Sequence, residues 1–156
     1  MKKILFVCTG NTCRSPMAEA LFKKLLKERN LHKNFEVGSA GVYAFEHDPA
    51  SYEAISVMQE EYGTDISSHR ARVLTDTDIK ENWLILTMTE HHREMILDIY
   101  PEGADKVFTI KEYAGADDEN PDISDPFGMD YDTYKYCAEE IEGLLLKIID
   151  KLIEAE

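Results

Sequence analysis

A cysteine and an arginine near the start of the chain stand at a spacing that suits phosphoryl transfer. Five residues separate Cys8 from Arg14, and Ser15 follows directly. A thiolate is a strong nucleophile, and the planar guanidinium of arginine binds two phosphoryl oxygens at once. The spacing therefore predicts that Cys8 attacks a phosphorus atom that Arg14 holds. The alternative is a buried strand-end cysteine beside an unrelated arginine, so the prediction depends on the flanking elements.

The elements on either side of this motif are those of an anion-binding loop. Residues 3–7 have the pattern of a buried strand, and Ser15 with the proline after it predicts the start of a helix that runs to about residue 29. Such a loop directs its backbone N–H groups at one point, so we expect it to accept phosphate or sulfate. The dipole of the following helix and the charge of Arg14 should lower the pKa of Cys8 to roughly 3.5–7.5. Gly10 and Asn11 suit the positive φ angles of a tight loop.

Short apolar runs alternate with amphipathic stretches along the rest of the chain. Because strands that alternate with helices form a parallel sheet covered on both faces, the pattern predicts a three-layer α/β/α fold. Ligands bind at the carboxyl ends of the strands in such folds, which is where the loop at 8–15 lies. The expected elements are strands at 35–40, 82–88 and 106–110, a helix that Asp48 and Pro49 cap and Gly63 ends, a helix from Thr89 to about residue 99, an acidic loop at 114–128, and a closing helix from Asp130 onward.

Length, charge and cysteine content limit the function classes. The 156 residues fit one domain spanning 1–156, and the net charge of −14 argues against nucleic acid as a partner. The apolar run at 83–86 is too short to cross a membrane. Three cysteines in a chain of this size favour a reducing, cytoplasmic location over a disulfide scaffold. No spacing of His, Cys and carboxylates suggests a metal site, and we expect no cofactor.

A phosphatase with a cysteine nucleophile also needs an acid to protonate the leaving group and a base to activate water. One carboxyl group can serve in both steps. Several acidic residues crowd positions 117–132, and composition alone cannot choose among them. Asp125 is distinguished by Pro126, which stiffens the chain after it, and by Phe127, which provides an apolar wall. We therefore expect Asp125 to be the general acid.

The segment at 7–19 has the sequence Val-Cys-Thr-Gly-Asn-Thr-Cys-Arg-Ser-Pro-Met-Ala-Glu, which resembles the signature of the low molecular weight protein-tyrosine-phosphatase family. The resemblance extends, in the family's order, to segments at 39–41, 68–72, 86–88 and 125–126. It implies a four-stranded parallel sheet flanked by helices. It also implies hydrolysis through a cysteinyl-phosphate intermediate, with the carboxyl group at 125 acting first as acid and then as base.

The resemblance further implies roles for residues in and around the loop. Ser15 would donate a hydrogen bond to the thiolate, while Asn11, Ser39 and His69 would hold the loop's shape. On the residues alone, Ser39 could be a turn residue and His69 a structural histidine. Cys13 resembles a second loop cysteine that forms a reversible disulfide with the nucleophile, and close packing is the alternative explanation. The expected phosphate-binding and supporting residues are Thr9, Gly10, Asn11, Thr12, Cys13, Ser15, Ser39 and His69.

The substrate within this family is indicated by Thr12. Threonine at this position resembles the bacterial protein-arginine phosphatases, whereas many tyrosine-specific members have Ile or Leu. The sequences at 88–89 and 125–128 resemble the same branch. A small polar side chain leaves room for a phosphoguanidinium, and Asp125 could pair with that cation. The alternative is a tyrosine phosphatase in which the threonine is a neutral substitution. The expected cleft residues are Thr12, Tyr43, Phe45 and Phe127, of which the aromatic ones could equally be ordinary packing.

Two other function classes fit the sequence less well. An arsenate reductase on the same fold needs two further thiols near residues 80–95, where this chain has none. A phosphoprotein-binding module without activity would not need Cys8, Arg14 and Asp125 together. We therefore expect an enzyme that acts on a phosphorylated protein, with neither nucleic acid nor a membrane as its partner.

Overall fold

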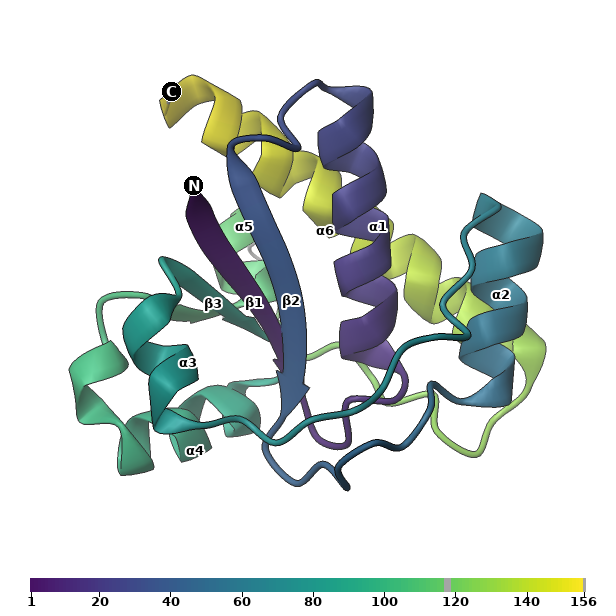
Figure 1. Cartoon of the computed structure of the whole chain (residues 1–156), viewed down its shortest axis with the longest axis horizontal. Coiled ribbons are helices and arrows are strands. Elements are labelled where there is room, and N and C mark those ends of the chain that lie inside the picture. The colour runs from purple at the N-terminus through teal and green to yellow at the C-terminus, as the bar shows by residue number, and fades with distance from the viewer. Residues whose placement is uncertain (117–118, 156) are drawn as a thin grey trace.

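The computed structural model describes residues 1–116 and 119–155, and it contains the predicted parallel sheet of four strands. In the order β2-β1-β3-β4, the strands pair in parallel throughout (Figure 1). Strand β1, one of the two inner strands, is buried from Ile4 to Cys8 because helices cover both of its faces. This burial explains its uninterrupted apolar sequence. The strands are β1 (Lys2–Cys8), β2 (Phe35–Gly41), β3 (Leu84–Thr87) and β4 (Val107–Thr109).

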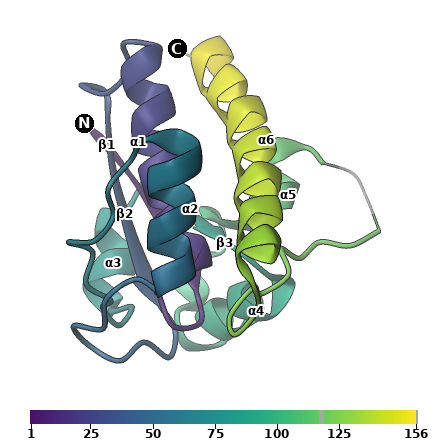
Figure 2. The same ribbon diagram turned by 90° about the vertical axis from the view of Figure 1, so that its right-hand side faces the viewer.

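Helices cover the two faces of the sheet, which confirms the three-layer prediction. They are α1 (Arg14–Glu28), α2 (Tyr52–Tyr62), α3 (Asp76–Glu81), α4 (Glu90–Ile99), the 3-10 helix η1 (Pro101–Gly103), α5 (Ile110–Ala114) and α6 (Tyr131–Ala155). On one face, α1, α2, α5 and α6 pack with strand residues such as Ile4 and Phe6, and Figure 2 shows α6 alongside α1 and α2. On the other face, α3 and α4 pack against Leu5 and Val7, because successive strand residues point to opposite faces.

Two predicted helix starts are wrong. The second helix begins at Tyr52 with Ser51 at its N-cap, and not after Asp48. The segment before it is held extended, because Ala71 donates its backbone N–H to the Asp48 carbonyl at 2.7 Å. The first helix begins at Arg14, and Ser15 is not its cap, because the serine hydroxyl is engaged in the loop. The predicted cap at Thr89 and the predicted end at Gly63 are confirmed.

The sequence prediction missed two short helices, α3 and α5. A capping box at the start of α3, formed by Thr75 and Asp78, was the available signal. Thr109 caps α5 in a similar way by accepting the backbone N–H of Glu112. Within the described ranges, no helix combines the length and apolar character that a membrane span requires.

The end of β2 packs tightly against the loop that follows β1. Gly41 pairs with Cys8 in the strand register. A Cβ atom at Gly41 would lie 2.5 Å from the carbonyl oxygen of Thr9 and 3.0 Å from the backbone nitrogen of Asn11. Both neighbours are backbone atoms, so the loop itself would have to move. Only glycine therefore fits at this position.

We predict that Gly41→Ala lowers the free energy of unfolding by about 1–3 kcal/mol and weakens phosphate binding, because it displaces the loop. The matched control is Gly38→Ala in the same strand, where a Cβ atom would lie 3.6 Å from the nearest atom, on Leu5. Urea unfolding and calorimetric titration with phosphate measure the two effects. Equal behaviour of the two alanine variants would contradict the prediction.

Candidate active site

The thiol of Cys8 lies at the end of β1, where it contacts a serine in the first turn of α1. Its Sγ atom is 2.9 Å from the Oγ atom of Ser15. The side-chain amide of Asn11 donates a 2.8 Å hydrogen bond to the same Oγ atom. Because that bond uses a lone pair of the hydroxyl, the Ser15 proton is free to point at the sulfur. The arrangement therefore supplies a hydrogen bond to a thiolate.

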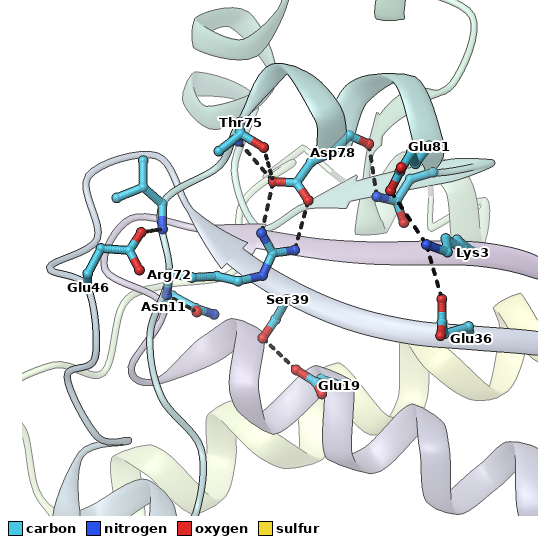
Figure 3. Close-up of polar contacts among 12 residues, drawn as sticks. Lys3, Asn11, Glu19, Glu36, Ser39, Glu46, Arg72, Thr75, Asp78 and Glu81 are labelled. Carbon is cyan, nitrogen blue, oxygen red and sulfur yellow. Dashed lines mark hydrogen bonds and ion pairs between the residues drawn. The ribbon is translucent and has the colours of Figure 1, made fainter.

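Asn11 connects the loop to the segment at 69–72. Its backbone has a φ of 57°, in the left-handed region that the sequence predicted. Its Oδ1 atom accepts the backbone N–H of Arg72 at 3.1 Å, and its carbonyl oxygen is 2.7 Å from Nε2 of His69. The Arg72 guanidinium in turn donates two 2.9 Å hydrogen bonds to Asp78 of α3 (Figure 3). The loop's shape is thus fixed from outside the loop.

Ser39 does not contact the loop in the way that was expected. Its hydroxyl donates a 2.6 Å hydrogen bond to Glu19 of α1 (Figure 3). No hydrogen bond joins its side chain to the loop at 8–15 in the part of the chain that the structure describes. The carboxylate of Glu19 is the acceptor that this β2 side chain reaches. Of the three predicted supporting residues, Asn11 and His69 therefore contact one another, whereas Ser39 lies apart from them.

Arg14 is buried beneath the loop, with 4% of its surface exposed. Its Nη1 atom donates a 2.7 Å hydrogen bond to the carbonyl oxygen of Ile123, and its Nη2 atom lies 3.5 Å from Oδ2 of Asp125. Its Nε atom is buried without a partner among residues 1–116 and 119–155. A buried cation with an unused N–H group suits an anionic ligand in the loop.

The segment that carries Asp125 is anchored to the turn between β3 and α4. Ile123 donates its backbone N–H to the carbonyl oxygen of Met88 at 2.8 Å, and the carboxylate of Asp122 accepts the backbone N–H of Glu90 at 2.8 Å. The Asp125 side chain remains half-exposed and accepts the backbone N–H of Phe127. A carboxyl group with one face in solvent can exchange protons with both ligand and water.

A cavity of about 340 Å³ opens over the loop and gathers most of the predicted site. The aromatic residues Tyr43, Phe45 and Phe127 are 68%, 77% and 69% exposed, so they form cleft walls and are not core residues. Asp48 was missed, because it was assigned to a helix cap and its extended conformation has no signal in the sequence. The lining residues are Cys8, Thr9, Gly10, Thr12, Cys13, Arg14, Tyr43, Phe45, Asp48, Asp125 and Phe127.

Comparisons with known proteins agree with this geometry. A family model described as low molecular weight phosphotyrosine protein phosphatase matches residues 3–156. A protein-arginine-phosphatase from Geobacillus stearothermophilus is 42% identical over 150 residues, which cover 96% of this chain and 95% of that protein. This chain belongs to the low molecular weight phosphatase family.

Other members of the family include proteins named for tyrosine. A low molecular weight protein-tyrosine-phosphatase, PtpB, from Staphylococcus epidermidis is 36% identical over 94% of this chain and 96% of its own length. The crystal structure of a low molecular weight protein tyrosine phosphatase from T. tengcongensis is 49% identical and superimposes with a TM-score of 0.90, covering 97% and 99% of the two chains. This chain is therefore a hydrolase of the protein phosphatase class.

The thiol of Cys8 is less acidic than the sequence predicted. Burial raises the pKa of Cys8, and it outweighs the hydrogen bond from Ser15 and the charge of Arg14, which lower it. The expected depressed pKa is therefore wrong for the loop as it stands, because the sequence could not show how deeply the sulfur is buried. Cys13 is also buried, with its Sγ atom 3.3 Å from the hydroxyl of Tyr134 and 3.5 Å from that of Ser51.

We predict that Ser15→Ala raises the pKa of Cys8 further, because a hydrogen bond to the thiolate is lost. The rate at which iodoacetamide alkylates Cys8, measured by mass spectrometry of its peptide, increases with pH as the thiolate forms. In the variant this increase should occur at a higher pH than in the parent. Ser39→Ala is the control and should leave the profile in place, since that hydroxyl bonds to Glu19. A Ser15→Ala profile that coincides with the parent profile would disprove the thiolate contact.

Proposed function

We propose that this chain is a cysteine-dependent protein phosphatase that hydrolyses phosphoarginine in proteins through a cysteinyl-phosphate intermediate. The observation that carries the proposal is that the thiol of Cys8, the buried guanidinium of Arg14 and the carboxyl group of Asp125 line the same cavity. Each performs a task that the reaction requires, namely attack, charge stabilisation and proton transfer. The three free thiols suit a reducing, cytoplasmic location.

In the first step, the Cys8 thiolate attacks the phosphorus atom while the loop's N–H groups and Arg14 bind the equatorial oxygens. A sulfur–phosphorus bond forms and the bond from phosphorus to the substrate's nitrogen breaks. Asp125 donates its proton to that nitrogen, so the guanidine leaves without an unfavourable negative charge. The hydrogen bond from Ser15 and the charge of Arg14 act against the effect of burial on the pKa of Cys8, and they favour the thiolate that attacks.

In the second step, water attacks the phosphorus atom of the cysteinyl phosphate. The Asp125 carboxylate accepts a proton from the water, an oxygen–phosphorus bond forms and the sulfur–phosphorus bond breaks. The sulfur leaves as a thiolate, again with Ser15 as its hydrogen-bond donor. Inorganic phosphate then departs, and Asp125 is protonated for the next cycle.

The preference for phosphoarginine is supported by the charge and size of the cleft walls. Asp48 lines the same cavity as Asp125 and the small polar side chain of Thr12. A guanidinium carries a positive charge beside the phosphoryl group, whereas a phenol carries none, so the carboxylate of Asp48 favours the former while Asp125 is protonated as the acid. The exposed aromatic walls suit either substrate. A tyrosine phosphatase of the same mechanism is the competing assignment, since relatives of both names match the chain.

The direct experiment compares kcat/KM for phosphoarginine and phosphotyrosine peptides of equal sequence. The parent should prefer phosphoarginine. Thr12→Ile should reduce kcat/KM for phosphoarginine by about tenfold to two-hundredfold more than for phosphotyrosine, because the larger side chain fills the space of the guanidinium. Thr12→Val separates the loss of the hydroxyl from the gain in size. A parent preference for phosphotyrosine would refute the arginine assignment and leave the phosphatase assignment in place.

We also predict that Asp48→Asn lowers kcat/KM for phosphoarginine by about twofold to fivefold, the effect expected of an exposed ion pair. Turnover of phosphotyrosine should stay level or rise, because a negative charge near the phosphoryl group is removed. Asp98→Asn, at an exposed position on α4 outside the cleft, is the control for net charge. If both asparagine variants change the two substrates alike, Asp48 does not select the guanidinium.

A further inference from the structure

A buried histidine of α4 contacts the nucleophile loop. His92 lies in the first turn of α4, and 3% of its surface is exposed. Its Nε2 atom is 2.8 Å from the Oγ1 atom of Thr9, the residue directly after the nucleophile. The turn before the helix fixes its backbone, because the Thr89 hydroxyl accepts the N–H of His92 at 3.1 Å. The backbone that carries the imidazole is therefore fixed at the start of α4, outside the loop.

We propose that His92 is a positioning residue for the reaction, and that it acts by holding the Thr9 hydroxyl and thereby the backbone that follows Cys8. The proposal rests on the assignment of Cys8 as nucleophile, but it applies to phosphoarginine and phosphotyrosine alike.

The contact adds an anchor to the part of the loop directly after Cys8. The extension of β2 binds the backbone there, through hydrogen bonds from the N–H groups of Val42 and Tyr43 to the carbonyl oxygens of Cys8 and Thr9. The side chain of Thr9 lines the cleft and would rotate freely without a partner. His92 restrains it from the β3–α4 side. The first peptide groups of the loop are thus held between two neighbouring strand ends.

The protonation state of His92 suits this task. Burial lowers its pKa to about 4, with the charges of Arg14 and His91 acting in the same direction and those of Asp122 and Asp125 opposing them. A neutral imidazole carries one N–H group, and Nδ1 is buried without a partner in the described ranges. Since a buried N–H group without an acceptor is costly, the proton belongs on Nε2, which donates to Thr9. The Thr9 hydroxyl then keeps its own proton for a second contact in the cleft.

Two amide variants distinguish this role from simple packing. Glutamine can place an amide near the position of the imidazole Nε2 atom, whereas asparagine reaches only the position of Nδ1. We expect His92→Asn to lower kcat/KM for p-nitrophenyl phosphate by about tenfold to a hundredfold, the scale of a misplaced reacting group. We expect His92→Gln to retain most of the parent value. Equal losses in the two variants would overturn the proposal.

A double-mutant cycle with Thr9→Val tests whether the effect passes through the hydroxyl. Thr9→Val keeps the side chain's shape at an exposed position and should cause a loss similar to that of His92→Asn. In the Thr9→Val background, His92→Asn should have little further effect. The same fold-loss in both backgrounds would show that His92 acts independently of Thr9.

Stability and the parent activity serve as controls for this cycle. Thermal unfolding of each variant shows whether a loss of activity comes from a destabilised core. If His92→Asn does not fold, Thr9→Val and Thr9→Ser decide the matter, because only the serine variant should keep the activity. A fully active Thr9→Val enzyme would then refute the proposal. A parent without turnover of p-nitrophenyl phosphate would instead refute the proposed function.

Discussion

The left-handed conformation of Asn11 is the constraint on which the loop at 8–15 depends. In that conformation its side chain reaches forward to Ser15 and outward to the backbone of Arg72, while its carbonyl oxygen faces His69. One residue therefore sets the position of the hydroxyl that contacts the Cys8 sulfur. Arg72, whose backbone N–H binds Asn11, is itself anchored to α3, because its guanidinium donates two 2.9 Å hydrogen bonds to Asp78.

The parallel sheet determines which segments meet at the cleft. Because all four strands run in the same direction, the segments after β1, β2 and β3 emerge at one edge. The first provides the nucleophile, the second provides Asp48, Tyr43 and Phe45, and the third anchors the segment that carries Asp125 and Phe127. Residues that are far apart in the sequence are thus brought within one cavity. Their relative positions follow from the strand order β2-β1-β3 and not from any local preference.

The sequence predicted the features that strong local patterns mark, and most of its errors in the site concern contacts between distant segments. The loop, the buried strand before it and the cap at Thr89 follow from local patterns, and the structure confirms them. The extended course of the chain around Asp48 follows from hydrogen bonds with Ala71, which no local pattern reveals. The raised pKa of Cys8 has the same origin, because the burial of its sulfur depends on the packing of the whole fold. The wrong cap at Ser15 is a local error, because its hydroxyl bonds to Cys8 and Asn11 within the loop.

The central claim of this account is that Cys8 carries the phosphoryl group during turnover. The most direct test is an acid quench of Asp125→Asn during steady turnover of p-nitrophenyl phosphate, followed by peptide mass spectrometry. Without the carboxylate that activates water, the intermediate should persist, and the account predicts one added phosphoryl group on the peptide that contains Cys8. A phosphoryl group on any other residue, or continued turnover with no modified peptide at all, would contradict it.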